Sequence, residues 1–426
     1  MAGMNAPGRT VVAGGGPGRM LLAYLLARAG LPVTLLERHQ DFDRDFRGDS
    51  LHPWTLELLD RLGLTGRLLE LPHLQARKFR FRTPRGTVTT SDYGLLDTPY
   101  DYVALMPQAR FLDFLAREAA AWPSFELRTG AAVSGLLGSG TAADPVRGVT
   151  LRDGEEIPAD LVVAADGRFS KLRTLAGRSA ESLGASTDLL WFNLPQHEDD
   201  PPDADVDLFF GEHHYVGLLG GPGRSGRARW QVGFSLPKGG YPALRAAGVE
   251  AVRREVAERV PWLADRVHLL TDLNETTLLS VDISRVPRWH RPGMLLIGDA
   301  AHVISPVGGN GILMACQDAV AAANHLVPAL RAGAPGDAVL AAVQAEREPA
   351  IVTVQEQQVQ VERKVARARE RGRPVTPPGF LRLLTRVPAI RRRSARRNAY
   401  GPVPVHPSPA LERALDLSPS PAITPS

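Results

Sequence analysis

The sequence predicts an α/β protein in which a Rossmann-like nucleotide-binding domain carries an inserted antiparallel β-sheet domain and is followed by a C-terminal helical region. Two observations predict the first domain: a strand–helix–strand pattern with a glycine-rich turn at residues 10–38, and a second strand–glycine loop–helix pattern at residues 294–330. The third observation is a series of short, aromatic-rich strand patterns between residues 189 and 281, which is typical of an antiparallel sheet.

The N-terminal pattern is a dinucleotide-binding unit. An apolar strand at 10–13 leads into the turn 14–19, an apolar helix follows to Gly30, and a second strand ends at Glu37-Arg38. Gly14 and Gly16 match the first two glycines of the G-x-G-x-x-G pattern, and Glu37 is placed for ribose hydroxyls. Arg19 replaces the third glycine, which normally allows close helix packing. The arginine either loosens this packing or lies beside a diphosphate, and the sequence leaves both open.

The loop at 298–311 is the second glycine-rich site. An apolar strand at 294–297 precedes it and a helical pattern starts at Ile312. Its glycines let backbone N–H groups approach a ligand, and the following helix directs its positive N-terminus at the loop. Asp299 falls at the carboxyl end of the strand, where open α/β sheets bind ligands, although a tight turn with an exposed carboxylate is an alternative.

Two further charged positions are candidates. Arg47 could contact a phosphate through its guanidinium, or it could be an ordinary surface arginine. Asp166 ends a buried strand at 160–165 and is followed by Gly167, and Ser170 can begin the next helix. The alternative for Asp166 is an acid in a turn.

The predicted inserted domain contains the hairpin 78–90 and the strands between 189 and 281. His213, His214 and Tyr215 are its candidate catalytic residues, although a histidine that is exposed or hydrogen-bonded within the fold is an alternative reading of each histidine. The expected domains are a discontinuous nucleotide-binding domain (8–72, 101–180 and 283–372), a substrate-binding domain (73–100 and 181–282), a basic helical segment (373–400) and a Pro/Ser-rich tail (401–426). The tail is predicted to be partly disordered from Pro402 onward.

Composition limits the compartment and the partners. A net charge of +4 over 426 residues does not indicate a nucleic-acid partner, and no apolar run reaches the length of a membrane span. Cys316 is the one cysteine, so no intrachain disulfide can form. We expect a cytoplasmic protein with a small-molecule substrate, no stable membrane insertion and no metal site. The oligomeric state is left open.

The three motifs, in this order, resemble those of the class A FAD-dependent flavoprotein monooxygenases, the p-hydroxybenzoate hydroxylase-like group. The resemblance extends to about residue 395 and is most specific at 298–319, at 165–167 with its flanks, and in the opening unit. It implies FAD as cofactor and NAD(P)H as transient reductant. The cofactor-binding residues that it and the opening unit predict are Gly14, Gly16, Glu37, Arg38, Arg47, Gln108, Asp166, Gly298, Asp299, Pro306, Gly309 and Gly311.

The resemblance also implies roles for these residues. The first motif would bind the ADP moiety and Glu37 its ribose, while Arg47 would contact the pyrophosphate. Gln108 and Gly298-Asp299 would lie along the ribityl chain, and the loop 306–311 would lie against the isoalloxazine ring. Asp166-Gly167 would lie behind the cofactor and is linked to contact with the pyridine nucleotide.

The implied reaction hydroxylates or epoxidises an apolar or aromatic small molecule through a flavin C4a-hydroperoxide, with NAD(P)H and O₂ consumed. Two departures support an alternative. Arg19 replaces the third glycine, and Leu313 stands where the family places an asparagine near the flavin ring. The alternative is a protein of this fold that has lost FAD and works as a cofactor-independent cyclase, isomerase or lyase, or as a non-catalytic binder.

Overall fold

The computed structural model describes residues 8–43, 48–83, 86–201, 205–211, 214–223, 227–306, 308–372 and 380–417. Two predicted site residues, Arg47 and His213, lie outside these ranges.

A six-stranded sheet forms the centre of the nucleotide-binding part, in the order β20-β21-β12-β1-β2-β8. All neighbouring strands are parallel except the pair β20–β21. The central strands are short and wholly apolar or buried because helices cover both faces. The strands are β1 (Thr10–Ala13), β2 (Val33–Leu36), β8 (Phe125–Arg128), β12 (Leu161–Ala164), β20 (His290–Arg291) and β21 (Met294–Leu296).

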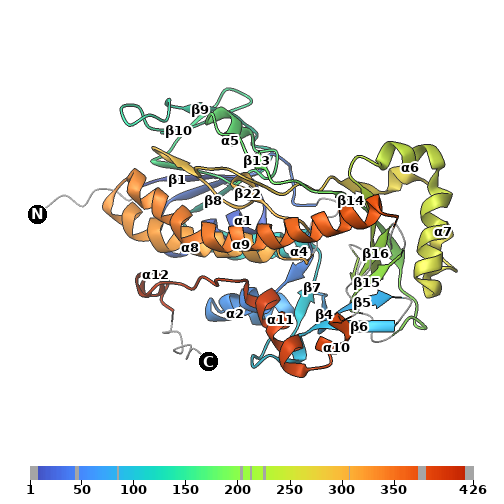
Figure 1. Cartoon of the computed structure of the whole chain (residues 1–426). Coiled ribbons are helices and arrows are strands. Elements are labelled where there is room, and N and C mark those ends of the chain that lie inside the picture. The colour runs from blue at the N-terminus through green and yellow to red at the C-terminus, as the bar shows by residue number, and fades with distance from the viewer. Residues whose placement is uncertain are drawn as a thin grey trace, which may run out of the picture.

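Four long helices pack around this sheet (Figure 1): α1 (Pro17–Arg28), α4 (Gln108–Ala120), α8 (Gly311–Ala332) and α9 (Asp337–Glu370). Helix α1 packs between α4 and α8, and ten of its twelve residues are buried. Because α1 and α8 each follow a glycine-rich loop, their packing brings the two loops to the same edge of the sheet.

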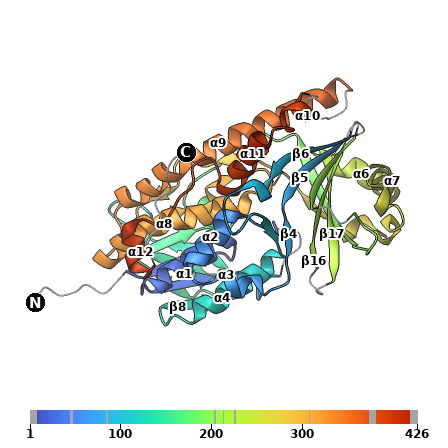
Figure 2. The ribbon, with the colours of Figure 1, turned by 90° about the horizontal axis from the view of Figure 1, so that it is seen from below.

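A seven-stranded sheet, in the order β18-β14-β17-β16-β15-β5-β6, forms the second part. The hairpin 78–90 belongs to this sheet, as the sequence predicts, and its strand β5 pairs parallel with β15. Helices α6 (Tyr241–Ala247) and α7 (Val249–Arg259) cover one face (Figure 2), and they are separated at Gly248, where φ is +82°. The strands are β5 (Lys78–Thr83), β6 (Gly86–Asp92), β14 (Thr187–Pro195), β15 (Val206–Phe210), β16 (Tyr215–Pro222), β17 (Ala228–Pro237) and β18 (Thr277–Leu279).

Smaller elements complete the fold. Three three-stranded sheets contain β3 (Ser50–Leu51), β7 (Val103–Leu105) and β4 (Leu74–Ala76); β9 (Val133–Leu137), β10 (Gly148–Leu151) and β11 (Glu156–Pro158); and β13 (Glu181–Ser182), β19 (Ser284–Arg285) and β22 (His302–Val303). The short helices are α2 (Pro53–Arg61), α3 (Thr65–Leu69) and α5 (Lys171–Leu175), with 3₁₀ turns at Tyr93–Leu95, Pro261–Leu263, Val267–Leu269, Leu273–Glu275 and Gly298–Ala300.

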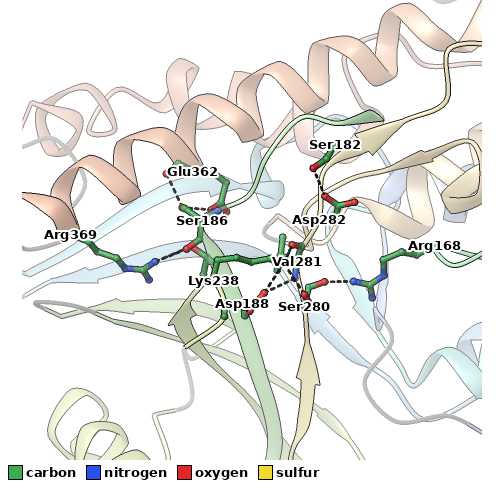
Figure 3. A network of polar contacts seen from close by, with 12 residues as sticks. Arg168, Ser182, Ser186, Asp188, Lys238, Ser280, Val281, Asp282, Glu362 and Arg369 are labelled. Carbon is green, nitrogen blue, oxygen red and sulfur yellow. Dashed lines mark hydrogen bonds and ion pairs between the residues drawn. The ribbon is translucent and has the colours of Figure 1, made fainter. Parts of the chain in front are cut away.

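The chain passes between the two main sheets near residue 188 and again near residue 280, and polar contacts join these two segments (Figure 3). The Nζ atom of Lys238 donates to Asp188 Oδ1 at 3.0 Å and to Ser280 Oγ at 2.8 Å. Glu362 on α9 accepts hydrogen bonds from the backbone N–H and the hydroxyl of Ser186 at 2.9 and 2.7 Å. Helix α9 therefore anchors the seven-stranded sheet to the nucleotide-binding part.

The chain after α9 returns to the nucleotide-binding part through α10 (Leu381–Leu384), α11 (Pro388–Tyr400) and α12 (Pro409–Ala414). The expectation of partial disorder from Pro402 does not hold for residues 402–417. Leu411 is fully buried against α8, Trp54 Nε1 donates to the carbonyl oxygen of Val405 at 3.0 Å, and Arg61 pairs with Glu412 at 2.6 Å. A few well-spaced apolar residues anchor this segment although its composition is rich in Pro and Ser. Residues 418–426 lie outside the described part.

Among the described helices, none is long and apolar enough to cross a membrane. Within the same described ranges, no group of three or more His, Cys, Asp or Glu side chains could hold a metal ion.

Candidate active site

A cavity of about 320 Å³ lies between the glycine-rich edge of the six-stranded sheet and the seven-stranded sheet. Of the predicted site residues, Gly16, Gln108, Gly298, Asp299, Tyr215, Pro306, Gly309 and Gly311 line it. Gly14, Glu37, Arg38, Asp166 and His214 do not line it, although several of them hold the loops that do. The structure therefore brings the two glycine loops and one face of the inserted sheet to a single cavity.

The first glycine loop has the geometry that a nucleotide site requires. Gly14 has a φ of +107°, which an L-residue with a side chain rarely adopts. Glu37 is only 1% exposed, and its Oε1 accepts a hydrogen bond from the N–H of His39 at 3.0 Å. The neighbouring Arg38 donates to the His39 ring at 2.9 Å. The acid at the end of β2 is thus held in place beside the loop.

A buried ionic cluster holds the second glycine loop. Asp318 on α8 accepts hydrogen bonds from the Gly298 N–H at 2.9 Å, from His302 Nε2 at 2.7 Å and from Arg347 Nε at 2.8 Å. Burial acts to raise the pKa of Asp318, but the charges and hydrogen bonds of His302 and Arg347 outweigh it and lower the pKa to about 2. This cluster fixes the backbone at the point where β21 ends and the second glycine loop begins.

The loop 308–311 is held by His52, the residue that follows β3. His52 Nε2 lies 3.2 Å from the carbonyl oxygen of Gly309, which has a φ of +70°. Burial lowers the pKa of His52 to about 4, so the ring is neutral at pH 7. Because Nε2 must donate to the carbonyl, Nδ1 is an acceptor, and it has no partner among the described residues.

Asp166 supports the site rather than facing it. Its carboxylate accepts from the Ser170 hydroxyl and from the Leu172 N–H, and Ser170 caps α5 as the sequence predicts. Arg173 on α5 then donates to the carbonyl oxygen of Ala300 at 3.1 Å. The Asp166 turn and the second glycine loop are therefore joined.

Leu313 lies away from the cavity. It is fully buried in the core of the nucleotide-binding part, and Ala315 lines the cavity instead. Helix α8 begins at Gly311 and turns residue 313 inward, so a leucine there removes no polar group from the wall of the cavity. Of the two departures that suggest a lost cofactor, only Arg19 is in the site.

The candidate residues of the inserted sheet have different surroundings. Tyr215 is 7% exposed and lines the cavity, and burial raises its pKa far above the usual value. The His214 ring stacks on Phe234 at 4.8 Å and its Nδ1 bonds to the carbonyl oxygen of Ser235 at 2.6 Å. His214 is therefore engaged in packing within the sheet.

Asp49 also lines the cavity, although it belongs to none of the sequence motifs. Its carboxylate faces β17, where Arg229 Nη2 lies at 3.3 Å and Gln231 Nε2 at 3.4 Å. Burial raises its pKa to about 6, against smaller opposing effects of Arg229, the Gln108 N–H and Gln231. The partners come from residues far along the chain, so the only signal in the sequence was an acid just before a buried strand.

A Rossmann-like domain with two glycine loops that face a second, mostly antiparallel sheet is typical of oxidoreductases with a dinucleotide cofactor. The chain matches the family described as FAD binding domain over residues 9–358, and it belongs to this family. The resemblance to class A FAD-dependent monooxygenases is thereby confirmed.

Similar proteins include 6-methylpretetramide 4-monooxygenase of Streptomyces rimosus, which is 36% identical over 92% of this chain and 91% of its own length. Protoasukamycin 4-monooxygenase of Streptomyces nodosus subsp. asukaensis is 28% identical over 76% of this chain and 80% of its own length. Among solved structures, PqsL of Pseudomonas aeruginosa in complex with 2-aminobenzoylacetate has a TM-score of 0.74 at 20% identity and covers 86% of this chain and 98% of that one. At that identity the likeness shows the fold.

The residues present fit FAD. Gly14 has the positive φ of a diphosphate-binding turn, with the Arg19 guanidinium lying across it, and the buried Glu37 ends β2 where a ribose would lie. Two buried polar atoms at the second loop, His52 Nδ1 and Asn310 Oδ1, have no hydrogen-bond partner among the described residues. The protein is an FAD-dependent monooxygenase that uses NAD(P)H as reductant, and the alternative of a cofactor-independent enzyme is not favoured.

Proposed function

We propose that the protein hydroxylates a fused-ring aromatic compound that carries a phenolic hydroxyl group. The observation that supports this proposal most directly is Asp49, a loosely held carboxylate at a cavity wall that is otherwise largely apolar on the side of the sheet. Apolar contacts there would come from Leu189, Trp191, Leu208 and Leu219. Two relatives named above act, by their names, on 6-methylpretetramide and protoasukamycin, which supports a large substrate.

Different groups of the cofactor-binding residues would contact different parts of FAD. Glu37 would bind the ribose and the turn 14–19 the diphosphate, with Arg38 beside the ribose and Arg47 as a further phosphate contact that the sequence alone suggests. Gln108, Gly298 and Asp299 would bind the ribityl chain. Pro306, Gly309 and Gly311 would pack on the isoalloxazine ring, and Asp166 would hold the turn behind it. When bound, FAD would supply the group that accepts a hydride from NAD(P)H and at which O₂ is activated.

Asp49 would accept a hydrogen bond from the substrate hydroxyl and remove its proton. Loss of the O–H proton places negative charge on the ring, which makes the ring carbon a better nucleophile toward the oxygen that the cofactor delivers. A base with a pKa of about 6 is mostly ionised at pH 7 and can release the proton again. Arg229 would keep the carboxylate ionised, and Gln231 would orient it.

The remaining expectations concern the setting. We propose that the enzyme works in the cytoplasm, where NAD(P)H is available and the buried Cys316 stays reduced.

The proposal is tested with purified protein loaded with FAD. NAD(P)H oxidation and product formation are measured with 1-naphthol, larger fused-ring phenols and their methyl ethers. We expect tight coupling of NAD(P)H oxidation to hydroxylation with a phenol and not with its ether. Equal turnover of phenols and ethers, or no turnover of any aromatic compound, would contradict the proposed substrate class.

A further inference from the structure

Arg19 lies on the inner side of the first glycine loop, at the position of the missing third glycine. It is the third residue of α1, half-buried, and lines the cavity. A Cβ atom built on Gly16 would lie 2.6 Å from Arg19 Nη2, and one built on Gly14 would overlap the guanidinium group. The side chain therefore folds back across the loop instead of entering the interface between α1 and its neighbours.

Gly18 provides the close approach that the third glycine normally provides. A Cβ atom on Gly18 would overlap the carbonyl oxygen of Ala315 on α8 and lie 2.8 Å from its carbonyl carbon. The glycine that close packing requires has thus moved one position toward the N-terminus. Position 19 can carry a side chain without loosening the helix, which decides between the two possibilities that the sequence leaves open.

We propose that Arg19 is a ligand of the FAD diphosphate, added to the backbone N–H groups of the loop. This inference rests on FAD being the cofactor. The first turn of α1 contains no acidic residue, so the arginine adds positive charge at the positive end of a helix dipole. Toward the helix dipole that placement is unfavourable, and beside two phosphate groups it is favourable. A guanidinium group also matches the geometry of phosphate oxygens.

Arg19 also has a polar interaction of its own in this structure, so a bound diphosphate must add to that interaction or replace it. The alternative is that the guanidinium blocks the phosphate position. The two possibilities predict changes of FAD affinity with opposite signs when the charge is removed.

The test measures the affinity for FAD by quenching of flavin fluorescence at low and high salt. The variants are Arg19→Gln, which removes the charge at similar size, and Arg19→Lys, which keeps it. We expect Arg19→Gln to bind FAD about tenfold to a hundredfold more weakly, with a smaller dependence on salt, because a charge-assisted contact is lost. The FAD affinity of Arg19→Lys should lie between that of the wild type and that of Arg19→Gln. Arg152→Gln, an exposed arginine outside the cavity, is the control of equal net charge and should behave as the wild type.

Thermal unfolding separates a ligand role from a structural role. Without FAD, Arg19→Gln should melt close to the wild type, because the loss of the polar interaction of Arg19 is offset by removal of a positive charge from the helix N-terminus. With FAD, its stabilisation should be smaller than that of the wild type. A purely structural arginine would lower the melting temperature in both conditions, which would overturn the inference.

Three results of the binding experiment would overturn the inference. Unchanged affinity and salt dependence in Arg19→Gln would show that Arg19 has no part in FAD binding, and tighter binding would show that it blocks the site. Wild-type protein that does not bind FAD at any salt concentration would contradict the cofactor itself, and binding restored by Arg19→Gly would then identify the block.

Discussion

Two aspartates on either side of the second glycine loop, a fully buried Asp318 and a partly exposed Asp49, have opposite environments. Asp318 has three contacts of 2.7–2.9 Å with Gly298, His302 and Arg347, and its pKa is lowered to about 2. Asp49 has two side-chain contacts of 3.3–3.4 Å, and its pKa is raised to about 6. The first carboxylate lies in the core with short hydrogen bonds and serves the fold, while the second has longer side-chain hydrogen bonds and lines the cavity. Burial alone does not identify a functional acid, because the strength of its charged and hydrogen-bonded partners decides the direction of its pKa shift.

The largest expected effect is on stability, from Asp318→Ala. The substitution leaves Arg347 charged and buried without its partner, so we expect the free energy of unfolding to fall by about 3–5 kcal/mol. Urea unfolding of the FAD-loaded protein measures the change. The double variant Asp318→Asn/Arg347→Met removes both charges and should recover part of the loss. A loss below about 1 kcal/mol in the single variant would show that the cluster does not hold the loop.

Asp49→Asn should act on catalysis instead. With the base removed, we expect the rate of hydroxylation of a fused-ring phenol at pH 7 to fall by at least about a hundredfold. FAD binding should be retained, and NAD(P)H oxidation should become uncoupled from product formation. The residual rate should rise with pH as the phenol ionises in solution. Asp97→Asn, which changes an exposed carboxylate, is the control. A variant within threefold of the wild type would contradict the role of Asp49.

The same substitution should change the pH dependence of stability. The pKa of Asp49 is raised in the folded protein, so its contribution is fully favourable below the unfolded value of about 3.8 and is lost as pH rises through about 6. At pH 7 the ionised carboxylate is a cost, and Asp49→Asn should increase the free energy of unfolding by about 1–2 kcal/mol. The difference between the variants should vanish near pH 4. For Asp318 the sign is opposite: its stabilisation is present above about pH 4 and is lost toward pH 2.

Leu313→Asn should have a smaller effect, which lies in the stability of the protein and not in its affinity for FAD. The side chain is fully buried in the core and does not line the cavity. An amide there lacks a guaranteed partner, so we expect the free energy of unfolding to fall by about 1–3 kcal/mol with no gain in FAD affinity. Chemical denaturation and flavin titration measure the two quantities. A marked increase in FAD affinity would place residue 313 at the cofactor after all.

The smallest effect is expected for a carboxylate on the surface. Glu118 pairs with Arg67, whose side chain is 57% exposed. We expect Glu118→Gln to change the free energy of unfolding by less than about 1 kcal/mol, because water and salt screen the pair. Unfolding in urea at low and high salt checks this result. A loss comparable to that of Asp318→Ala would show that burial does not separate these carboxylates.

Much of the fold could be predicted from local patterns. The two glycine loops, the βαβ unit and the separate sheet for the hairpin follow from residues that are neighbours in sequence. The site is harder to predict because its contacts join residues that are far apart in the sequence. Asp49 meets Arg229 across 180 residues, and the inward turn of Leu313 depends on the register of α8. The shift of the packing glycine from 19 to 18 also required the position of Ala315.

The central claim is that FAD-dependent oxygen insertion takes place in this cavity. The most direct measurement is mass spectrometry of the product formed by the FAD-loaded protein with NAD(P)H, 1-naphthol or a larger fused-ring phenol, and isotopically labelled O₂. The account predicts a product with one labelled oxygen atom, whose formation requires FAD and NAD(P)H and is lost in Asp49→Asn. A product that forms without FAD and contains no labelled oxygen would contradict it.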